Sequence, residues 1–336
     1  MDGPIIEARN LEKRFTIRRH REGAFGAMRS LVDRGGNAVS AVKDVSFSIN
    51  RGEMVGYIGP NGAGKSTTIK MLTGILVPSS GEATVAGFTP WESRKQLAQQ
   101  IGVVFGQRTQ LWWDLALTDS LELLRHMYRI PEKRFRENLD RARELLVLDD
   151  FMHTPVRQLS LGQRMRGDLA AALLHDPKIL YLDEPTIGLD IVAKARIREF
   201  LAALNRETHV TVLLTTHDLA DIEQLCRRII VIDRGQVVYD GELGTLRNRF
   251  GGKRHVILDF DQDPGEAIST LAGNNVEIVH HNGPRVRVAF DRETTSAPRV
   301  LALASHHGTV RDMSIEEPAI EDVIRQMYEG PDSHHP

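Results

Sequence analysis

The sequence is poor in the features that mark secreted, membrane-spanning and nucleic-acid-binding proteins. A single cysteine, Cys226, excludes an internal disulfide and is typical of a reducing cytoplasm. No run of about eighteen apolar residues occurs, so no membrane-spanning helix is predicted. The first residues lack a basic stretch followed by an apolar one, so no secretory signal is expected. The formal net charge of −2 predicts no nucleic-acid partner.

What the chain does contain is the pattern of a phosphate-binding loop. Its residues are Gly59, Pro60, Asn61, Gly62, Ala63, Gly64, Lys65, Ser66 and Thr67. A buried strand is predicted before the loop over Met54–Ile58, and a helix after it over Thr68–Leu72. Those flanks argue against a chance glycine-rich turn. Glycines let backbone N–H groups converge on phosphate oxygens, Lys65 can reach the β- and γ-phosphates, and the Ser66 hydroxyl can hold Mg²⁺.

The first two thirds of the chain alternates between strand-like and helical patterns. Strands are predicted over 5–8, 45–49, 82–86, 101–105, 178–182 and 210–214, helices over 92–100, 120–148, 161–175 and 193–205, and a hairpin over 228–239. This alternation predicts an α/β core with a mostly parallel sheet. We expect the nucleotide-binding domain to cover residues 5–249, with a helical subdomain at about 108–177.

A linker is predicted at Gly251-Gly252-Lys253, followed by a small accessory domain over 250–330. Its predicted elements are strand 255–260, helix 265–271, strands 276–280 and 285–290, helix 297–304, strand 309–314 and a final helix 320–328. The β-α-β-β-α-β order is that of the split βαβ arrangement, so an α+β, ferredoxin-like domain is expected. Residues 331–336 are predicted to form a disordered tail. Three pairs of adjacent histidines from residue 280 onward are interpreted as surface residues, because no cysteine or carboxylate pattern accompanies them.

A basic insertion over about 18–37 separates the first two strands. Phe25, Met28 and Leu31 recur there at roughly helical spacing, among five arginines. One interpretation is a surface insertion whose small apolar face packs on the domain. The other is an amphipathic segment at a membrane surface or partner. Gly23 and Gly26 weaken a helix and favour the first interpretation.

Two acidic residues follow a strongly apolar strand. Asp183 and Glu184 end the segment that begins at Ile179, and parallel strands deliver such residues to the nucleotide crevice. Asp183 is therefore a candidate for the Mg²⁺ shell, and Glu184 a candidate to orient or deprotonate an attacking water. Alone, the pair could be an acidic turn after a core strand. The phosphate-binding loop makes the functional interpretation the stronger one.

A second anion site is predicted at the start of the helix beginning near residue 161. Leu159-Ser160-Leu161-Gly162-Gln163 places Ser160 as a natural N-cap. With this segment, the sequence resembles the ATP-binding subunits of ABC transporters, whose signature motif is Leu-Ser-Gly-Gly-Gln. Ser160, Gly162 and Gln163 match it, while Leu161 replaces the first glycine.

The resemblance covers about residues 5–245 and implies roles for further residues. Gln107 resembles the Q-loop glutamine, a ligand of Mg²⁺ and a link to the transmembrane partner. Asp190, in Gly188-Leu189-Asp190, resembles the D-loop residue. His217 resembles the switch histidine that contacts the γ-phosphate. Phe15 is a candidate to stack on adenine, although a core phenylalanine would explain it nearly as well.

The resemblance implies an ATPase with ATP and Mg²⁺ as cofactors and a P-loop NTPase core of the ABC type. Because the signature motif of one protomer covers the ATP of another, a head-to-tail homodimer through the nucleotide sites is expected. The accessory domain resembles that of ABC-2 type subunits. This implies one or two ABC-2 type permease partners, a peripheral location on the cytoplasmic face of the cell membrane, and export.

Two other functions are compatible with parts of the pattern. A soluble ABC ATPase acting on a non-membrane partner such as the ribosome or DNA would usually carry two tandem nucleotide domains or a long coiled-coil insertion, and this chain has neither. A regulatory subunit that binds ATP without hydrolysing it would not be expected to retain both Glu184 and His217.

Two of the three tryptophans, Trp112 and Trp113, are adjacent and follow Gln107 closely. The resemblance implies that this region forms the groove that receives a cytoplasmic helix of the permease. Adjacent side chains point in different directions on a strand or a helix, so one can anchor in the core while the other faces the groove. The alternative is that both are buried.

Overall fold

The computed structural model describes residues 3–17, 37–106, 108–250, 253–272, 275–291, 294–316 and 320–329. The contacts within the chain divide it into two compact units, residues 1–241 and 242–336. Each unit has its own hydrophobic core. The predicted 18–37 insertion, apart from its last residue, and the predicted tail lie outside the described residues.

The first unit is built on a six-stranded sheet. Its strand order is β5 (Ile101–Phe105), β6 (Ile179–Asp183), β7 (Thr211–Thr215), β3 (Met54–Ile58), β8 (Arg228–Asp233) and β9 (Gln236–Glu242). The pairs from β5 through β8 are parallel, as predicted, while β8 and β9 form the predicted hairpin. Ile179, Leu180, Tyr181 and Leu182 are all fully buried. Such unbroken apolar strands are typical of a parallel sheet covered on both faces.

A second, antiparallel sheet lies in the same unit. Its order is β2 (Asn37–Ile49), β1 (Ile6–Ile17) and β4 (Ser80–Val85). Both β1 and β2 are longer than the predicted strands, and they pair with each other along their whole length with several register shifts. The core combines residues of both sheets with helix α2 (Lys65–Leu72), including Leu11, Tyr57, Ile69 and Leu213.

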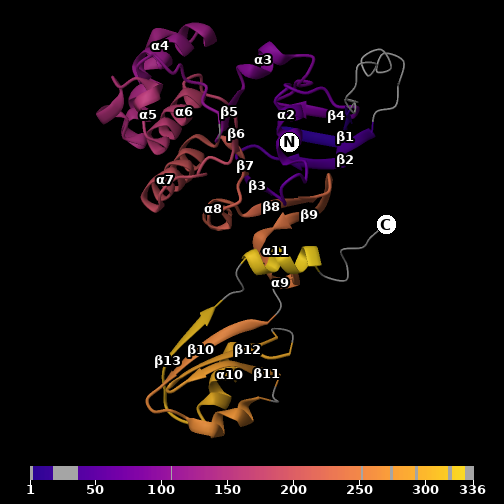
Figure 1. Cartoon of the computed structure of the whole chain (residues 1–336), viewed down its shortest axis with the longest axis vertical. Helices are drawn as coiled ribbons and strands as arrows, with labels where there is room; N and C mark the ends of the chain where they lie inside the picture. The colour runs from indigo at the N-terminus through magenta and orange to yellow at the C-terminus, as the bar shows by residue number, and fades with distance from the viewer. Residues whose placement is uncertain are drawn as a thin grey trace, which may run out of the picture. The chain divides into compact units, whose positions relative to one another are not determined.

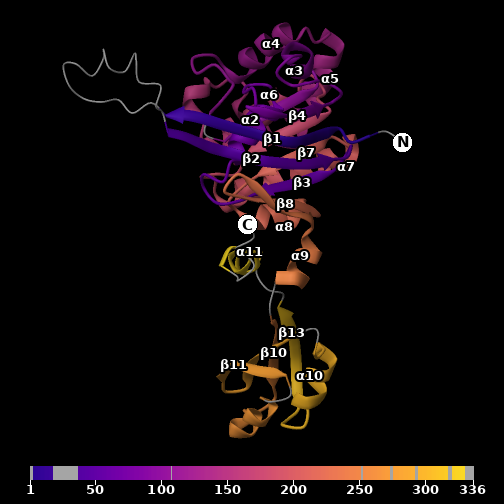
Figure 2. The same ribbon diagram turned by 90° about the vertical axis from the view of Figure 1, so that its right-hand side faces the viewer.

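Helices α4 (Leu117–Tyr128), α5 (Glu132–Leu146), α6 (Leu161–Leu173) and α7 (Ile191–Thr208) gather at the side of the sheet where β5 and β6 lie, whereas α8 (Leu219–Leu225) lies by β8 (Figures 1 and 2). The first unit also contains α3 (Arg94–Ala98) and the 3₁₀ turns η1 (Asp149–Phe151) and η2 (Val156–Gln158). The single helix expected over 120–148 is in fact two helices. The break follows from Arg129, which ends α4 in a left-handed conformation, and from Pro131 before α5.

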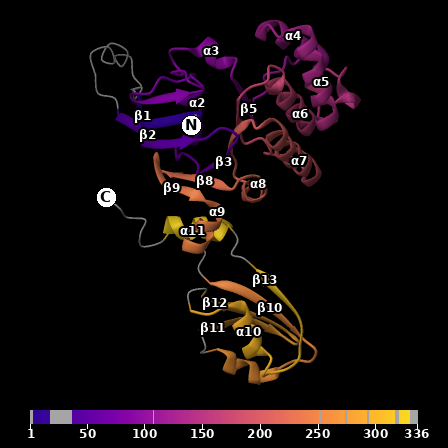
Figure 3. The same ribbon diagram turned by 180° about the vertical axis from the view of Figure 1, so that it is seen from behind.

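The second unit contains a four-stranded antiparallel sheet (Figure 3). Its order is β11 (Val276–Asn282), β12 (Arg285–Phe290), β10 (Arg254–Phe260) and β13 (Val310–Glu316). Helix α10 (Ala297–Ala304) and the 3₁₀ helix η3 (Gly265–Leu271) pack on it, and both contribute to the core. With strand order 4-1-3-2, this is the split βαβ topology predicted, except that the first helix is 3₁₀.

Two further helices complete the second unit, α9 (Leu243–Phe250) and α11 (Ile320–Glu329), and they contact each other. The sequence places the domain boundary at residue 249/250, whereas the contacts place it at 241/242. The difference arises because α9 packs against a helix about seventy residues later in the chain, which is a tertiary contact that local sequence patterns do not show.

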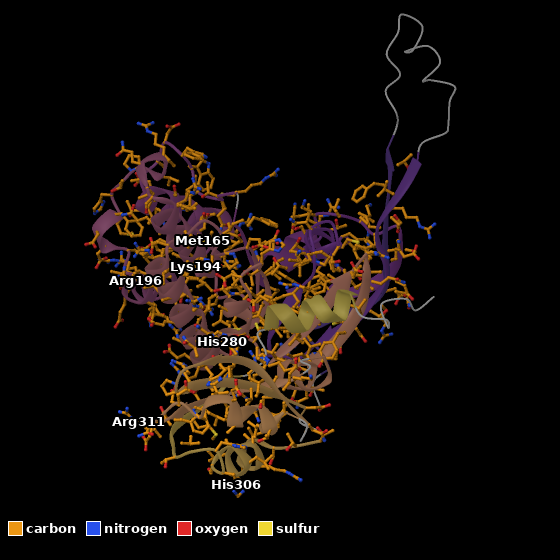
Figure 4. All side chains as sticks on the ribbon, turned by 60° about the horizontal axis from the view of Figure 1, so that its bottom comes forward. Met165, Lys194, Arg196, His280, His306 and Arg311 are labelled. Atoms are coloured by element: carbon orange, nitrogen blue, oxygen red, sulfur yellow. The ribbon has the colours of Figure 1, made fainter. Side chains whose placement is uncertain are left out.

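Among the described residues, no helix combines the length and apolar character needed to cross a bilayer. Cys226 is buried as expected, and burial raises the pKa of its thiol to about 12. The described histidine pairs lie at or near the surface: His280, His281 and His306 are exposed and His307 is half-buried (Figure 4 labels His280 and His306). The part of the chain that the structure describes holds no cluster suited to a metal ion built from histidine, cysteine and carboxylate residues.

Candidate nucleotide-binding site

The phosphate-binding loop follows β3 and leads directly into α2, as the sequence predicts. Two glycines are required there by close approach. A Cβ atom on Gly59 would lie 2.2 Å from the Ile232 carbonyl oxygen, and one on Gly64 would lie 2.5 Å from that of Ala41. Gly64 also has a φ of 108°, which disfavours other residues. The loop therefore curls tightly against β8 and β2 and presents its N–H groups at the start of a helix.

Lys65 is held inward over this loop. Its Nζ donates to the carbonyl oxygens of Gly59 at 2.5 Å and Pro60 at 3.2 Å. The side chain is largely buried, and this desolvation lowers the pKa of its ammonium, while nearby Glu184 and Asp183 oppose the shift. A partly desolvated cation beside the backbone N–H groups of this loop is suited to binding a phosphate.

The ends of four parallel strands meet at the same edge of the sheet. Phe105, Asp183 and Thr215 are paired in register at the carboxyl ends of β5, β6 and β7, and the loop follows β3 beside them. Asp183 Oδ1 accepts a hydrogen bond from Thr215 Oγ1 at 2.5 Å, and Oδ2 accepts one from Ser66 Oγ at 3.1 Å. This edge is where open α/β sheets bind their ligands.

Ser66 and Asp183 form an oxygen donor pair suited to Mg²⁺. A hydroxyl and a carboxylate within hydrogen-bond distance of each other, next to a phosphate-binding loop, match the hard ligands and the phosphate neighbourhood that Mg²⁺ prefers. Gln107, the third predicted ligand, lies outside the described residues. The residue before it, Gly106, donates from its N–H to the Asp183 carbonyl oxygen at 2.7 Å, so the chain enters this segment at the same edge.

Glu184 and His217 face each other at this edge. The His217 N–H donates to Glu184 Oε2 at 3.2 Å, and His217 Nε2 lies 3.3 Å from Oε1. Oε1 is buried without a hydrogen-bond partner among the described groups. Burial raises the pKa of the Glu184 carboxyl, although His217 and Lys65 reduce the shift. A buried carboxylate oxygen with a raised pKa and free acceptor capacity can take a proton from water.

Glu184 also has a backbone φ of 58°, in the left-handed region. Such a conformation costs a non-glycine residue about 1–3 kcal/mol and is common where a side chain must be aimed at a site.

One cavity of about 660 Å³ brings most of the predicted residues together. It is lined by the loop residues 61–67 with Asp183, Glu184 and His217, and also by Ala41, Lys70, Ile75, Phe105, Gly106 and Arg108. This volume falls within the range typical of small-molecule and cofactor sites. Phe15 is not among the described lining residues. It is 38% exposed on β1, with Lys13 Nζ 5.5 Å from its ring centre.

Several lining residues were not predicted as site residues. Lys70 follows Ser66 by four positions and so shares its helix face, which the spacing could have shown. Thr215 is not among the described lining residues, but it donates a hydrogen bond to Asp183 and lies two residues before His217, a proximity that could have indicated it. Ala41 and Ile75 come from segments that carry no chemical signal, and only the fold brings them here.

The signature segment lies in a different cavity of the same unit. This cavity of about 480 Å³ is lined by Ser160, Leu161, Gly162, Gln163, Arg166, Gly188, Leu189, Asp190, Val192, Ala193 and Arg196. Figure 4 labels Met165 on α6 and Lys194 and Arg196 on α7, the two helices that begin at this cavity. The predicted cofactor-binding residues are thus divided between two cavities.

Both helices that begin at the second cavity carry an N-cap. Gln163 N–H donates to Ser160 Oγ at 3.2 Å, and Ser160 N–H donates to Gln163 Oε1 at 2.9 Å, which is a capping box. Asp190 caps α7 by accepting from Ala193 N–H at 2.8 Å. Leu161 has a packing role, since a Cβ atom on Gly188 would lie 2.9 Å from its Cδ2 atom. Leu161 therefore closes the space beside the Gly188-Leu189-Asp190 turn.

Comparison with known proteins identifies the family of the chain. A family model described as "ABC transporter" matches residues 42–187, and one described as "ATP-binding protein DrrA1-3-like, C-terminal domain" matches residues 241–328. The chain is similar to the ABC transporter ATP-binding protein NatA of Bacillus subtilis, with 37% identity covering 62% of this chain and 84% of that protein. It is also similar to the linearmycin resistance ATP-binding protein LnrL of the same organism, with 32% identity covering 83% and 91%.

Among solved structures, a dimeric ATP-binding cassette in a post-hydrolysis state with ADP and Pi is similar to this chain. The TM-score is 0.59 at 28% identity, and the match covers 71% of this chain and 98% of that one.

Proposed function

Because this chain belongs to the family of ABC transporter ATP-binding proteins, and so binds and hydrolyses ATP to power transport, we propose specific roles for its site residues and partners. The loop residues 59–67 bind the phosphates, with Lys65 as their counter-charge. Ser66 and Asp183 hold Mg²⁺, together with Gln107. Mg²⁺ supplies charge neutralisation on the phosphates when bound.

We propose that Glu184 is the general base. Its Oε1 is buried, has no hydrogen-bond donor among the described residues and belongs to a residue that lines the nucleotide cavity, so it can accept a proton from a water placed beside the γ-phosphate. His217 contacts the same carboxylate through its backbone N–H and holds it in place. In this proposal the His217 ring, 3.3 Å away from Oε1, contacts the γ-phosphate and senses its loss.

The division of binding residues between two cavities carries the proposal of a dimer. Ser160, Gly162, Gln163 and Asp190 line a cavity that shares no residue with the one around Lys65. A head-to-tail pair of chains related by a two-fold axis would place each signature cavity over the loop of the other copy and form two composite sites. Hydrolysis would then remove the γ-phosphate contacts and favour opening.

We also propose that the subunit works with one or two ABC-2 type permeases at the cytoplasmic face of the cell membrane, and that the transport is export. The match of residues 241–328 to a DrrA-like C-terminal domain and the resistance function in the name of LnrL support this proposal. The alternative of a soluble ABC ATPase with a non-membrane partner has no counterpart among the relatives described above.

The composite site can be tested by the oligomeric state of the purified chain. Glu184→Gln with ATP and Mg²⁺ should elute as a dimer with a mass twice that of one chain, and without ATP as a monomer. Ser160→Arg in the same background is expected to abolish the dimer while ATP binding persists, because only the partner's nucleotide would be obstructed. A Glu184→Gln chain that stays monomeric with saturating ATP would contradict the composite site.

A further inference from the structure

A buried carboxylate on helix α6 connects two segments of the first unit. Asp168 is only 4% exposed. Its Oδ1 accepts hydrogen bonds from Thr109 Oγ1 and from the Gln110 backbone N–H, both at 2.9 Å. In return, Gln110 Nε2 donates to the Asp168 carbonyl oxygen at 3.0 Å. Three hydrogen bonds thus join α6 to the segment that follows Gln107.

Core packing does not explain an acidic residue at this position. Its neighbours Leu169, Ala170 and Ala171 are fully buried and apolar. Burial raises the pKa of the Asp168 carboxyl from its usual 3.8 to about 6, while its hydrogen bonds and Arg164 oppose the shift. At neutral pH an ionised group therefore occupies a site that favours a neutral one. The hydrogen bonds from Thr109 and Gln110 offset part of that cost, so these contacts are the feature of the site that calls for an acceptor.

The segment that Asp168 holds contacts α6 along successive turns. Thr109 Oγ1, besides donating to Asp168, accepts from Leu111 N–H at 3.1 Å. A Cβ atom on Gly167 would lie 3.0 Å from Leu111 Cδ1, so the helix and the segment approach closely. One turn earlier on α6, the Arg164 guanidinium lies 5.5 Å from the ring centre of Trp113. The helix therefore contacts residues 109–113 from three residues on two successive turns.

Helix α6 and the segment 109–113 each end at a residue with a proposed function, Ser160 and Trp113. Ser160 is the N-cap of helix α6, whose thirteen residues span about 20 Å. The segment ends at Trp113, which is 52% exposed, whereas Leu111 is buried. One connection between Ser160 and Trp113 runs through the preceding turn, where the Arg157 N–H donates to the Trp113 carbonyl oxygen at 3.0 Å. The contacts of α6 with residues 109–113 are the second connection, and through them the helix and the segment move as one body.

We propose that Asp168 is a positioning residue that locks residues 109–113 to helix α6, so that displacement of Ser160 is transmitted rigidly to Trp113. The inference rests on the proposed contact of Ser160 with nucleotide. The proposed role needs a side-chain oxygen at residue 168 that accepts the hydrogen bonds from Thr109 and Gln110. It does not need the negative charge of the carboxylate.

Two substitutions separate the acceptor from the charge. Asp168→Asn keeps an acceptor oxygen and the size of the side chain but removes the charge. Asp168→Ala removes the acceptor and leaves the Gln110 N–H and the Thr109 hydroxyl without it. Asn138→Ala is the matched control, because Asn138 Nδ2 donates to the Leu174 carbonyl oxygen at the other end of α6, at 2.9 Å. Trp91→Phe in every variant leaves Trp112 and Trp113 as the only tryptophans.

The measurements are tryptophan emission with a non-hydrolysable ATP analogue and Mg²⁺, affinity for that analogue, ATP turnover and melting temperature. We expect the analogue to shift the emission of the Trp91→Phe parent, of Asp168→Asn and of Asn138→Ala. Asp168→Ala should bind the analogue normally but lose the shift, with kcat reduced by about tenfold to a hundredfold and KM unchanged. Asp168→Asn should melt no lower than the parent at pH 7.5, because it removes a buried charge.

Several results would overturn the inference. One is an unchanged shift in Asp168→Ala, and another is an equal loss in Asp168→Asn. The inference would also be overturned if the Trp91→Phe parent hydrolyses ATP but shows no emission shift with the analogue, because no movement then reaches the tryptophans. If Asp168→Ala does not fold, Thr109→Val decides, and a full shift in that variant contradicts the lock. Failure of the parent to bind ATP would instead contradict the proposed function.

Discussion

Glu184 combines three unusual properties: a left-handed backbone, a buried carboxylate oxygen with no donor in the described part of the chain, and a raised pKa. The largest cause of the raised pKa is desolvation, and His217 opposes it. Lys65, by contrast, has its pKa lowered by the same physical effect. The site therefore raises the pKa of the Glu184 carboxyl and lowers the pKa of the Lys65 ammonium. Functional sites commonly shift pKa values in this way.

The first prediction concerns Glu184→Gln. The variant should bind ATP as the wild type does, and its turnover should fall by about 10²- to 10⁴-fold, because the amide cannot accept the proton. Single-turnover hydrolysis and equilibrium ATP binding measure the two effects separately. Turnover near the wild-type rate would show that another group is the base.

The second prediction concerns pH. A general base must be ionised, and the pKa of Glu184 is raised above the usual value of about 4.3 for glutamate. Turnover should therefore decline as pH falls through that raised pKa, above the range of an exposed glutamate. The residual turnover of Glu184→Gln should lack this acid limb. Rate profiles of both proteins at saturating ATP make the comparison, and superimposable profiles would contradict it.

The third prediction compares two lysines of the same cavity. Lys65→Ala should weaken ATP binding by about tenfold to a hundredfold, because a charge-assisted hydrogen bond to phosphate is lost. Lys70→Ala should have a smaller effect, since Lys70 lines the cavity from an exposed position farther along α2. Calorimetric titration with ATP measures both, and equal losses would argue against a special role for Lys65.

Among the helices and loops around the site, a buried ion pair and its hydrogen bonds join four segments. Asp221 on α8 is 1% exposed and pairs with Arg198 of α7 at 3.0 Å. It also accepts hydrogen bonds from Thr186 and Thr216, which lie two residues after Glu184 and directly before His217. Asp221 therefore ties α7 and α8 to the two segments that position Glu184 and His217.

The fourth prediction is that Asp221→Ala lowers the free energy of unfolding by about 3–5 kcal/mol, because it leaves Arg198 buried without its partner. Lys194→Ala is the control, since the Lys194–Asp218 pair is partly exposed and is worth about 0.2–1 kcal/mol. Urea unfolding of each variant gives the comparison. Similar losses in both would mean that burial does not distinguish the two pairs.

The fifth prediction concerns the two tryptophans. Trp113 is 52% exposed and Trp112 is half-buried. Trp113 is therefore the better candidate for a contact with a partner. Trp113→Ala should retain the ATPase activity of the isolated subunit and lose co-purification with permease partners, because exposed tryptophans are frequent interface hot spots. Trp112→Ala should mainly lower the melting temperature. Normal assembly and transport by Trp113→Ala would remove this surface from the permease contact.

At the scale of the whole molecule, the division at 241/242 has a consequence for truncation. A chain ending at Gly241 retains every described residue of both cavities, and the second unit keeps its own core. We expect residues 1–241 to unfold cooperatively and to bind ATP. A chain ending at Arg249 should do the same, with α9 deprived of α11. Circular dichroism melts and ATP binding test both, and an insoluble 1–241 product would show that the units depend on each other.

Sequence patterns alone predicted most of the polar residues that line the first cavity. Glycines at close approaches, the lysine and serine of the loop, and acids after an apolar strand are local patterns, and each is tied to one element by strand or helix periodicity. The same periodicity predicted the parallel sheet and the succession of strands and helices along the second unit. Its errors were at element boundaries, where Arg129 and Pro131 divide a helix that looked continuous.

Only the tertiary structure decided which residues meet. It separated Ser160 from Lys65 into two cavities, left Phe15 outside both, and buried Asp168 and Asp221 against segments far away in the sequence. The reason is physical: a side chain's identity is local, but its burial, its partners and its pKa depend on elements that pack against it from elsewhere in the chain. Asp168 is an ordinary helix residue in the sequence, and becomes a buried hydrogen-bond acceptor only where α6 meets residues 109–110.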